Sequence, residues 1–155
     1  MIESKFSPIE EVQNIREVIK NLFNIELDIS GGWGYDKESA TIVHSYNDMD
    51  IEQFLHLFAS IRANLEMNIL QEEENRYAGI NLTLLDRKKI ILDTQDYDLF
   101  TFEISAMKES DYSKFIKDYK EGYGKESFNV SAHFEERKRS TIFREVDYWF
   151  QGELK

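Results

Sequence analysis

Histidine is the side chain most often used for proton transfer and metal binding at neutral pH, and this chain has three of them. They stand at His44, His56 and His133, and none of them belongs to a short metal-binding motif such as H-E-x-x-H. This spacing favours structural or solvated histidines over metal ligands. Convergence of a histidine with distant carboxylates in the folded chain stays open.

Three carboxylates fall within six residues, at Asp93, Asp96 and Asp98. Oxygen clusters of this kind bind hard cations such as Ca²⁺ and Mg²⁺, but the segment lacks the glycine and the distal glutamate of an EF-hand loop. Aspartate is also a common turn residue, so the segment is predicted to be a solvated connection between two strands. An acidic edge that meets a basic partner ranks ahead of a metal site.

The glycine-rich segment Gly31-Gly32-Trp33-Gly34 invites comparison with a phosphate-binding loop. It lacks both the Lys-Ser/Thr pair of a P-loop and the G-x-G-x-x-G order of a dinucleotide-binding loop. Glycine supplies positive φ angles, so the segment is predicted to be a turn over which Trp33 and Tyr35 pack. The alternative is that these rings project outward and anchor a protein partner, because Trp and Tyr dominate interface hot spots.

No residue pattern points to catalysis. Cysteine is absent, and no G-x-S-x-G elbow presents a serine nucleophile. The 30 acidic residues are too numerous for two of them to be singled out as a catalytic pair. We therefore assign no catalytic residue, no metal and no cofactor, and we expect that the protein is not an enzyme.

The charge balance restricts the partners. Thirty acidic residues against nineteen basic ones give a formal net charge of −11. A field of this sign repels nucleic acid and anionic membranes and attracts basic proteins. We interpret the basic runs Arg87–Lys89 and Arg137–Arg139 as solubilising groups at a turn and at a helix end, and Glu72–Glu74 as a solvated helix end.

Composition and segment lengths indicate a folded protein of the cytoplasm. Aromatic residues are 14% of the chain, which an acidic disordered chain would lack. The absence of cysteine fits a reducing compartment. The N-terminus has no signal-peptide pattern, and no stretch approaches the eighteen apolar residues of a membrane span.

The elements that must position these side chains follow from apolar periodicity. Helices are predicted from Ser7 to Asn24, from Asp50 to the acidic run at 72–74, from Ser110 to Gly122 and over 142–152. Strands are predicted at 25–30, 39–46, 80–85, 90–93, 99–105 and 128–132, with a turn at 86–89. The first two helices begin with capping boxes, Ser7 with Glu10 and Asp50 with Gln53. The segment 142–152 also fits a strand, and the helix is favoured for its spacing of apolar residues.

The resulting order, α-β-β-α-β-β-β-α-β-α, separates the helices by hairpin-like strand pairs. It predicts an α+β fold in which a mainly antiparallel sheet is packed by about four helices. At this length, residues 1–155 are expected to form a single domain.

A small, acidic, cysteine-free α+β chain with Gly-Gly-Trp-Gly-Tyr-Asp at positions 31 to 36 resembles the immunity proteins of bacterial contact-dependent growth inhibition and related polymorphic toxin systems. The resemblance implies that the protein binds and neutralises a cognate toxin domain, often a nuclease with a basic active-site cleft. It carries over no catalytic residues.

Charge supports the same hypothesis, because an acidic surface can imitate a nucleic-acid substrate and occlude a basic cleft. The candidate partner-binding residues are Trp33, Tyr35, Asp36, Glu72, Glu73, Glu74, Asp93, Asp96, Tyr97 and Asp98. A different protein-interaction or regulatory domain stays open, as does an enzyme that uses dispersed carboxylates and a histidine. A homodimer formed through Tyr148-Trp149-Phe150 is compatible with each of these.

Overall fold

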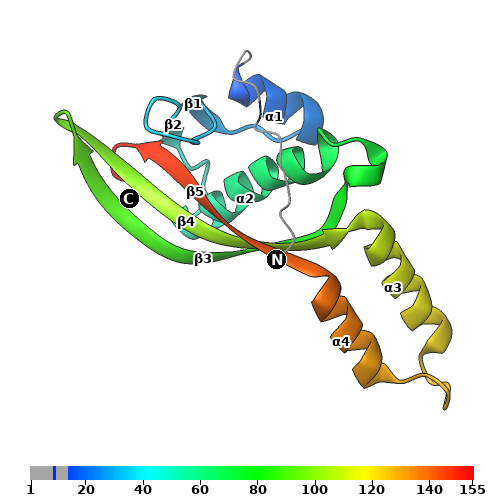
Figure 1. Ribbon diagram of the computed structural model, residues 1–155. Coiled ribbons are helices and arrows are strands. Elements are labelled where there is room, and N and C mark those ends of the chain that lie inside the picture. Colours follow the sequence, from blue (N-terminus) through cyan, green and yellow to red (C-terminus); the bar gives the residue numbers. More distant parts are fainter. Residues whose placement is uncertain (1–8, 10–13) are drawn as a thin grey trace.

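The computed structural model describes Ile9 and residues 14–155, and five strands of this part form one mixed sheet (Figure 1). The strands are β1 (Asp28–Gly31), β2 (Thr41–Ser45), β3 (Tyr77–Leu92), β4 (Gln95–Lys108) and β5 (Thr141–Gln151). The helices are α1 (Ile15–Phe23), α2 (Ile51–Asn64), α3 (Glu109–Gly122) and α4 (Val130–Ser140), with a π-helix, η1 (Leu65–Ile69), and a 3₁₀ turn, η2 (Glu73–Asn75).

The strand order in the sheet is β1-β2-β5-β4-β3. Neighbouring strands pair antiparallel except for β2 and β5, which are parallel and meet at Thr41 and Phe150. The described residues therefore form a single α+β domain with a mostly antiparallel sheet and four α-helices, which confirms the predicted fold class.

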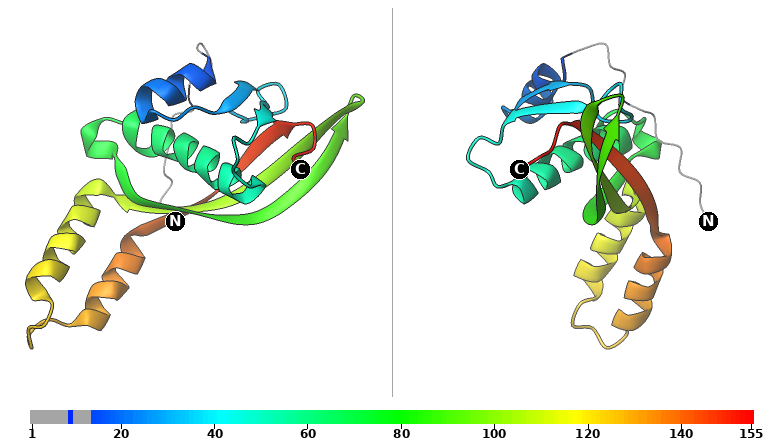
Figure 2. Two further views of the ribbon diagram at one scale, coloured as in Figure 1. Left: turned by 180° about the vertical axis from the view of Figure 1, so that it is seen from behind. Right: turned by 90° about the vertical axis from the view of Figure 1, so that its left-hand side faces the viewer.

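Helices α1 and α2 lie on one face of the sheet (Figures 1 and 2). Alternate residues of β4, namely Phe100, Phe102 and Ile104, are buried on this side, as the sequence predicts. They pack under Phe58 of α2, whose ring lies 5.6 Å from that of Phe150. We call the opposite side of β3, β4 and β5 the outer face.

Helices α3 and α4 form a hairpin that projects from the end of the sheet (Figures 1 and 2). α3 follows β4 directly and α4 leads directly into β5, so the two helices continue two neighbouring strands. Within the hairpin only Phe115 of α3 and His133 of α4 are buried. The hairpin therefore has a small core of its own.

Helix ends follow the predicted capping residues. Asn24 ends α1 in the left-handed conformation, and the side chains of Asp50 and Gln53 form the predicted capping box of α2. The helical path of α2 continues through η1 and stops at Ile69, before the acidic run at 72–74. The predicted start of the first helix at Ser7, Pro8 and Glu10 lies outside the described residues.

The predicted turn at 86–89 is wrong, because these residues belong to the single 16-residue strand β3. The chain turns instead at Asp93 and Thr94, whose φ angles of 50° and 66° suit a two-residue hairpin loop. β3 is an edge strand, where charged side chains are common because they discourage pairing with other chains. A charged run on an edge strand therefore resembles a turn in the sequence.

The predicted helix at 142–152 is also wrong, because this segment forms β5. Val146, Tyr148 and Phe150 are buried and alternate with exposed or half-buried residues, as in a strand with one covered face. Tyr148 and Phe150 are each 1% exposed, so of the segment Tyr148-Trp149-Phe150 only Trp149 is accessible to a second copy of the chain. The predicted strand at 128–132 is instead the start of α4, where Asn129 caps the helix.

Candidate protein-binding face

Trp33 does not face a partner. Its side chain is 1% exposed and its ring stacks on Phe58 at a centroid distance of 6.2 Å. Gly34, with a φ of 83°, passes so close to β5 that a Cβ atom would lie 2.8 Å from the carbonyl oxygen of Trp149. The glycine turn therefore serves packing, which confirms the packing alternative for Trp33 and contradicts the exposed anchor.

Tyr35 belongs to a buried polar network. Its hydroxyl donates to Oε2 of Glu66 at 2.6 Å and accepts from the amide of Ile9 at 3.0 Å. Arg62 lies between the rings of Tyr35 and Tyr148, with its guanidinium carbon 4.0 Å from each ring centroid. Burial raises the pKa of both phenols, so they remain neutral hydrogen-bonding groups.

The centre of this network is the ion pair of Arg62 and Glu66, each about 1% exposed, with Nε and Oε2 3.4 Å apart. Arg62 also donates to the carbonyl oxygens of Trp33 and Gly34. The sequence reasoning missed this pair, although its i, i+4 spacing on the second predicted helix was a readable signal. Burial lowers the pKa of Arg144, whose Nη1 lies 3.7 Å from Glu66.

Asp98 is fully buried and anchors the C-terminal segment. Both of its oxygens accept from Arg87, at 2.6 to 3.2 Å, and Oδ2 also accepts from the amide of Leu154 at 3.0 Å. These hydrogen bonds from Arg87 to Asp98 raise the pKa of the guanidinium. Asp98 therefore supplies no charge to a partner surface, and Arg87 is not a solubilising turn residue.

The remaining predicted residues are exposed but dispersed. Asp36 lies in the turn before β2, where its carboxylate accepts from Ser39. Glu72–Glu74 lie next to the start of β3, whereas Asp93 and Asp96 lie at its far end. The 16 residues of β3 span about 50 Å, so these two acidic groups do not share one surface.

The outer face of the sheet instead gathers four carboxylates, which we call the acidic quartet: Asp86 of β3, Glu103 of β4, and Glu145 and Asp147 of β5. The register places Glu103 directly opposite Glu145. It also places Thr101 between Asp86 and Asp147, and the hydroxyl of Thr101 donates to Asp147 at 2.7 Å.

The acidic quartet is poorly compensated. Directly opposed like charges destabilise a sheet, and Glu103 and Glu145 are such a pair. In the described part of the chain, no Lys or Arg forms an ion pair with Glu103, Glu145 or Asp147, and the Nζ atom of Lys88 lies 3.9 Å from Asp86. Among the described residues, the negative charge of Glu103, Glu145 and Asp147 is therefore not balanced by an ion pair.

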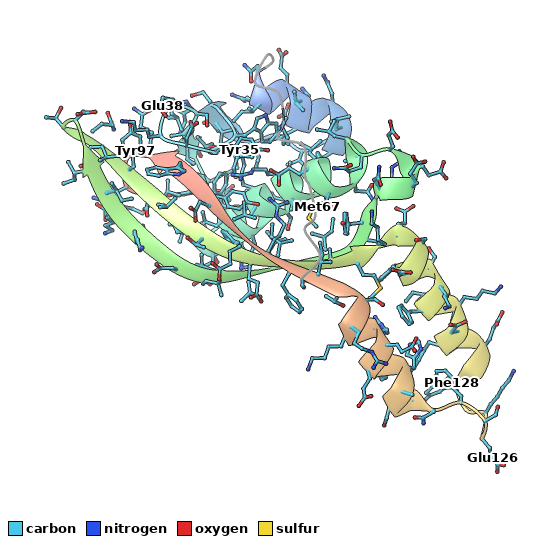
Figure 3. All side chains as sticks on the ribbon, viewed as in Figure 1. Tyr35, Glu38, Met67, Tyr97, Glu126 and Phe128 are labelled. Carbon is cyan, nitrogen blue, oxygen red and sulfur yellow. The ribbon has the colours of Figure 1, made fainter. Side chains whose placement is uncertain are left out.

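Apolar side chains continue the outer face toward the β3–β4 turn. Leu99 lies between Lys88 and Trp149 in the register, and Tyr97 is in the next row with Ile90. The rings of Tyr97 and Trp149 meet edge to face at 5.9 Å. Tyr97, which Figure 3 shows at this end of the sheet, is therefore the predicted residue that the structure places beside the quartet.

The histidines lie apart from this face and from one another. His44 contacts the hydroxyl of Ser30 at 2.8 Å, the ring of His56 lies 5.7 Å from Phe102, and His133 is in the helical hairpin. Among residue 9 and residues 14–155, no three His, Asp or Glu side chains gather closely enough to hold a metal ion. The four carboxylates of the quartet are thus spread over the surface of the sheet.

None of the helices in the described residues combines the length and the apolar character that crossing a bilayer requires. Comparison with protein-family models, with curated proteins and with solved structures finds no match to this chain. The functional interpretation therefore depends on the residues of the chain itself.

Proposed function

We propose that this chain is a protein-binding inhibitor of the immunity type, which acts in the cytoplasm and neutralises a basic toxin domain by covering its active-site cleft. The observation that carries the proposal is the acidic quartet, in which only Asp86 has an ion-pair partner among the described residues, on an outer face that no described helix covers at its centre. The proposal assigns the protein no catalytic residue and no cofactor.

The quartet costs stability in the free protein, and a basic partner would relieve this cost on binding. In the free protein Glu103 and Glu145 repel each other, at a cost of roughly 0.2–1 kcal/mol. A basic partner would convert this repulsion into attraction and would accelerate association. The net charge of −11 extends the same attraction to longer range.

The neighbouring aromatic residues would supply the apolar part of the contact. Tyr97 and Trp149 are half-buried in the free protein, and their mutual packing already fixes their orientation. Rigid aromatic side chains lose little conformational entropy when a partner covers them. A flat three-strand surface also suits a protein partner better than a small ligand, which binds in concave sites.

The proposal is tested in bacteria by co-expression with candidate basic toxin domains, beginning with any toxin domain that a neighbouring gene encodes. The unmodified protein is expected to restore growth, and the outer-face variant Glu103→Gln/Glu145→Gln/Asp147→Asn is expected to lose this protection. The matched control Glu17→Gln/Glu126→Gln/Glu135→Gln removes the same number of charges from exposed sites elsewhere.

Three results are informative. Loss of protection by the outer-face variant alone supports the proposed surface. Equal protection by both variants contradicts the claim that the outer face binds the toxin, although the protein could still be an inhibitor. Failure of the unmodified protein to restore growth contradicts the proposal that the protein neutralises this toxin.

A further inference from the structure

The helical hairpin has an open, solvent-facing cavity of about 510 Å³ between α3 and α4. Three of its walls are aromatic: Phe115 on α3, Phe128 in the connection between the helices, and His133 on α4. Figure 3 shows Phe128 near the far end of the hairpin, away from the sheet. The ring of Phe128 packs directly on Gly122. A Cβ atom at position 122 would lie 2.4 Å from this ring, so only glycine allows Phe128 to occupy this position.

His133 is the unusual member of this wall. His133 is 8% exposed, and its Nε2 atom has no hydrogen-bond partner in the described part of the chain. Four rings surround it at centroid distances of 5.3 to 5.6 Å: those of Phe115, Tyr119, Phe128 and Phe134. A buried polar nitrogen without a hydrogen-bond partner is costly, so a hydrogen-bond donor that reaches it would bind favourably.

The charges of the cavity indicate what that donor is. Asp118, Glu121 and Glu136 line it, against a single basic residue, Lys125. In residues 14–155, Asp118 and Glu121 have no ion-pair partner, whereas Glu136 lies 3.9 Å from Arg139. Aromatic faces combined with free carboxylates are the usual surroundings of a bound organic cation.

We propose that this cavity binds an ammonium or guanidinium group. When the rings that bury Nε2 of His133 move aside, an N–H of the ligand donates to this atom, in the tautomer that carries its proton on Nδ1. The carboxylates of Asp118 and Glu121 balance the positive charge, and the rings of Phe115 and Phe128 cover the alkyl part. The site is separate from the outer face and goes beyond the proposed function.

The first test is an NMR titration of the complete protein with butylammonium chloride, observed at the ring nitrogens of His133. The expected result is a saturating shift with a Kd on the order of 1 mM. Neutral 1-butanol is the matched control and is expected to give no saturating shift. Absence of saturation by butylammonium, or an equal response to butanol, overturns the proposal.

Variants separate a charged site from an apolar pocket. Asp118→Asn/Glu121→Gln removes two carboxylates from the wall and leaves the aromatic cluster intact, so the Kd is expected to rise roughly tenfold. Glu126→Gln/Glu135→Gln removes the same charge from hairpin residues outside the wall and is expected to leave the Kd unchanged. An equal Kd for both variants overturns the charge-based site.

Two probes identify the source of the cation. Agmatine represents a free amine, and the acetylated, amidated peptide Gly-Gly-Arg-Gly-Gly represents an arginine of a protein partner. Tighter binding of either probe supports the site and names its source, whereas binding of neither overturns it. The outer-face variant is expected to bind both probes normally, so the result is independent of the proposed function.

Discussion

We call the sheet with α1 and α2 the body. The body and the helical hairpin differ in net charge and in the size of their hydrophobic cores. Residues 109–140 contain seven acidic and seven basic side chains, so the net charge of −11 comes from the rest of the chain. The body also holds nearly all of the hydrophobic core, whereas the hairpin buries only Phe115 and His133. The charge that would recognise a partner thus lies on the region that holds the larger hydrophobic core.

The joint between the two regions is small. The amide of Glu109 donates to the carbonyl oxygen of Arg76 at 2.8 Å, and the side chain of Asn68 donates to the carboxylate of Glu109 at 3.1 Å. Regions with few buried contacts open locally at low free-energy cost. The hairpin is therefore expected to unfold and refold locally while the body stays folded.

The largest effect is expected in the body, at the buried ion pair. Arg62→Met leaves the carboxylate of Glu66 buried without its main partner and should lower the free energy of unfolding by about 3–5 kcal/mol. Urea denaturation measures this loss. The double variant Arg62→Met/Glu66→Met, which removes both charges, should recover most of it, and a double variant no more stable than the single one would contradict the account.

A smaller loss is expected where Asp98 binds the C-terminal segment. Asp98→Asn weakens its hydrogen bonds with Arg87 and Leu154 and should cost about 2 kcal/mol, with faster amide exchange at Leu154. The exposed neighbour Asp96→Asn is the control and should change stability by less than about 0.5 kcal/mol. Equal effects of the two substitutions would show that Asp98 is not a structural residue.

The hairpin is expected to respond locally. Phe115→Ala removes the main apolar side chain of its core, so amides within 109–140 should exchange faster while those of β4 and β5 keep their protection. Tyr123→Ala, at a ring that is 69% exposed, is the control and should leave both regions unchanged. Parallel loss of protection in the body would show that the two regions unfold as one.

The smallest effect is a gain. Glu103→Gln removes the repulsion with Glu145 and should stabilise the free protein by about 0.5 kcal/mol. Urea midpoints measure the gain, which should shrink in 1 M NaCl because salt screens exposed charges. A destabilised Glu103→Gln variant would mean that the carboxylate makes a favourable contact in the free protein.

The sequence predicts the features that depend on neighbouring residues. The Asp50–Gln53 capping box, the end of α1 at Asn24 and the buried alternation of Phe100, Phe102 and Ile104 all follow from local chemistry. The α+β class follows in turn from the order of such elements.

The errors have a common physical origin. Ile142, Val146 and Phe150 are spaced by four, and this even spacing places them on one side of a strand as well as on one side of a helix. The acidic quartet could not be predicted, because its members come from three strands and only the sheet register brings them together. When residues 142–152 are assigned to a helix, Glu145 and Asp147 are no longer expected on the sheet, and the quartet cannot be recognised.

The most direct test of the central claim is a calorimetric titration of the purified protein with the toxin domain against which it protects cells in the co-expression test. The account predicts that the outer-face variant Glu103→Gln/Glu145→Gln/Asp147→Asn raises the Kd by at least about tenfold. It predicts that the control Glu17→Gln/Glu126→Gln/Glu135→Gln, with the same change in charge, binds as the unmodified protein does. An equal Kd for the two variants would contradict the claim that the outer face is the binding surface.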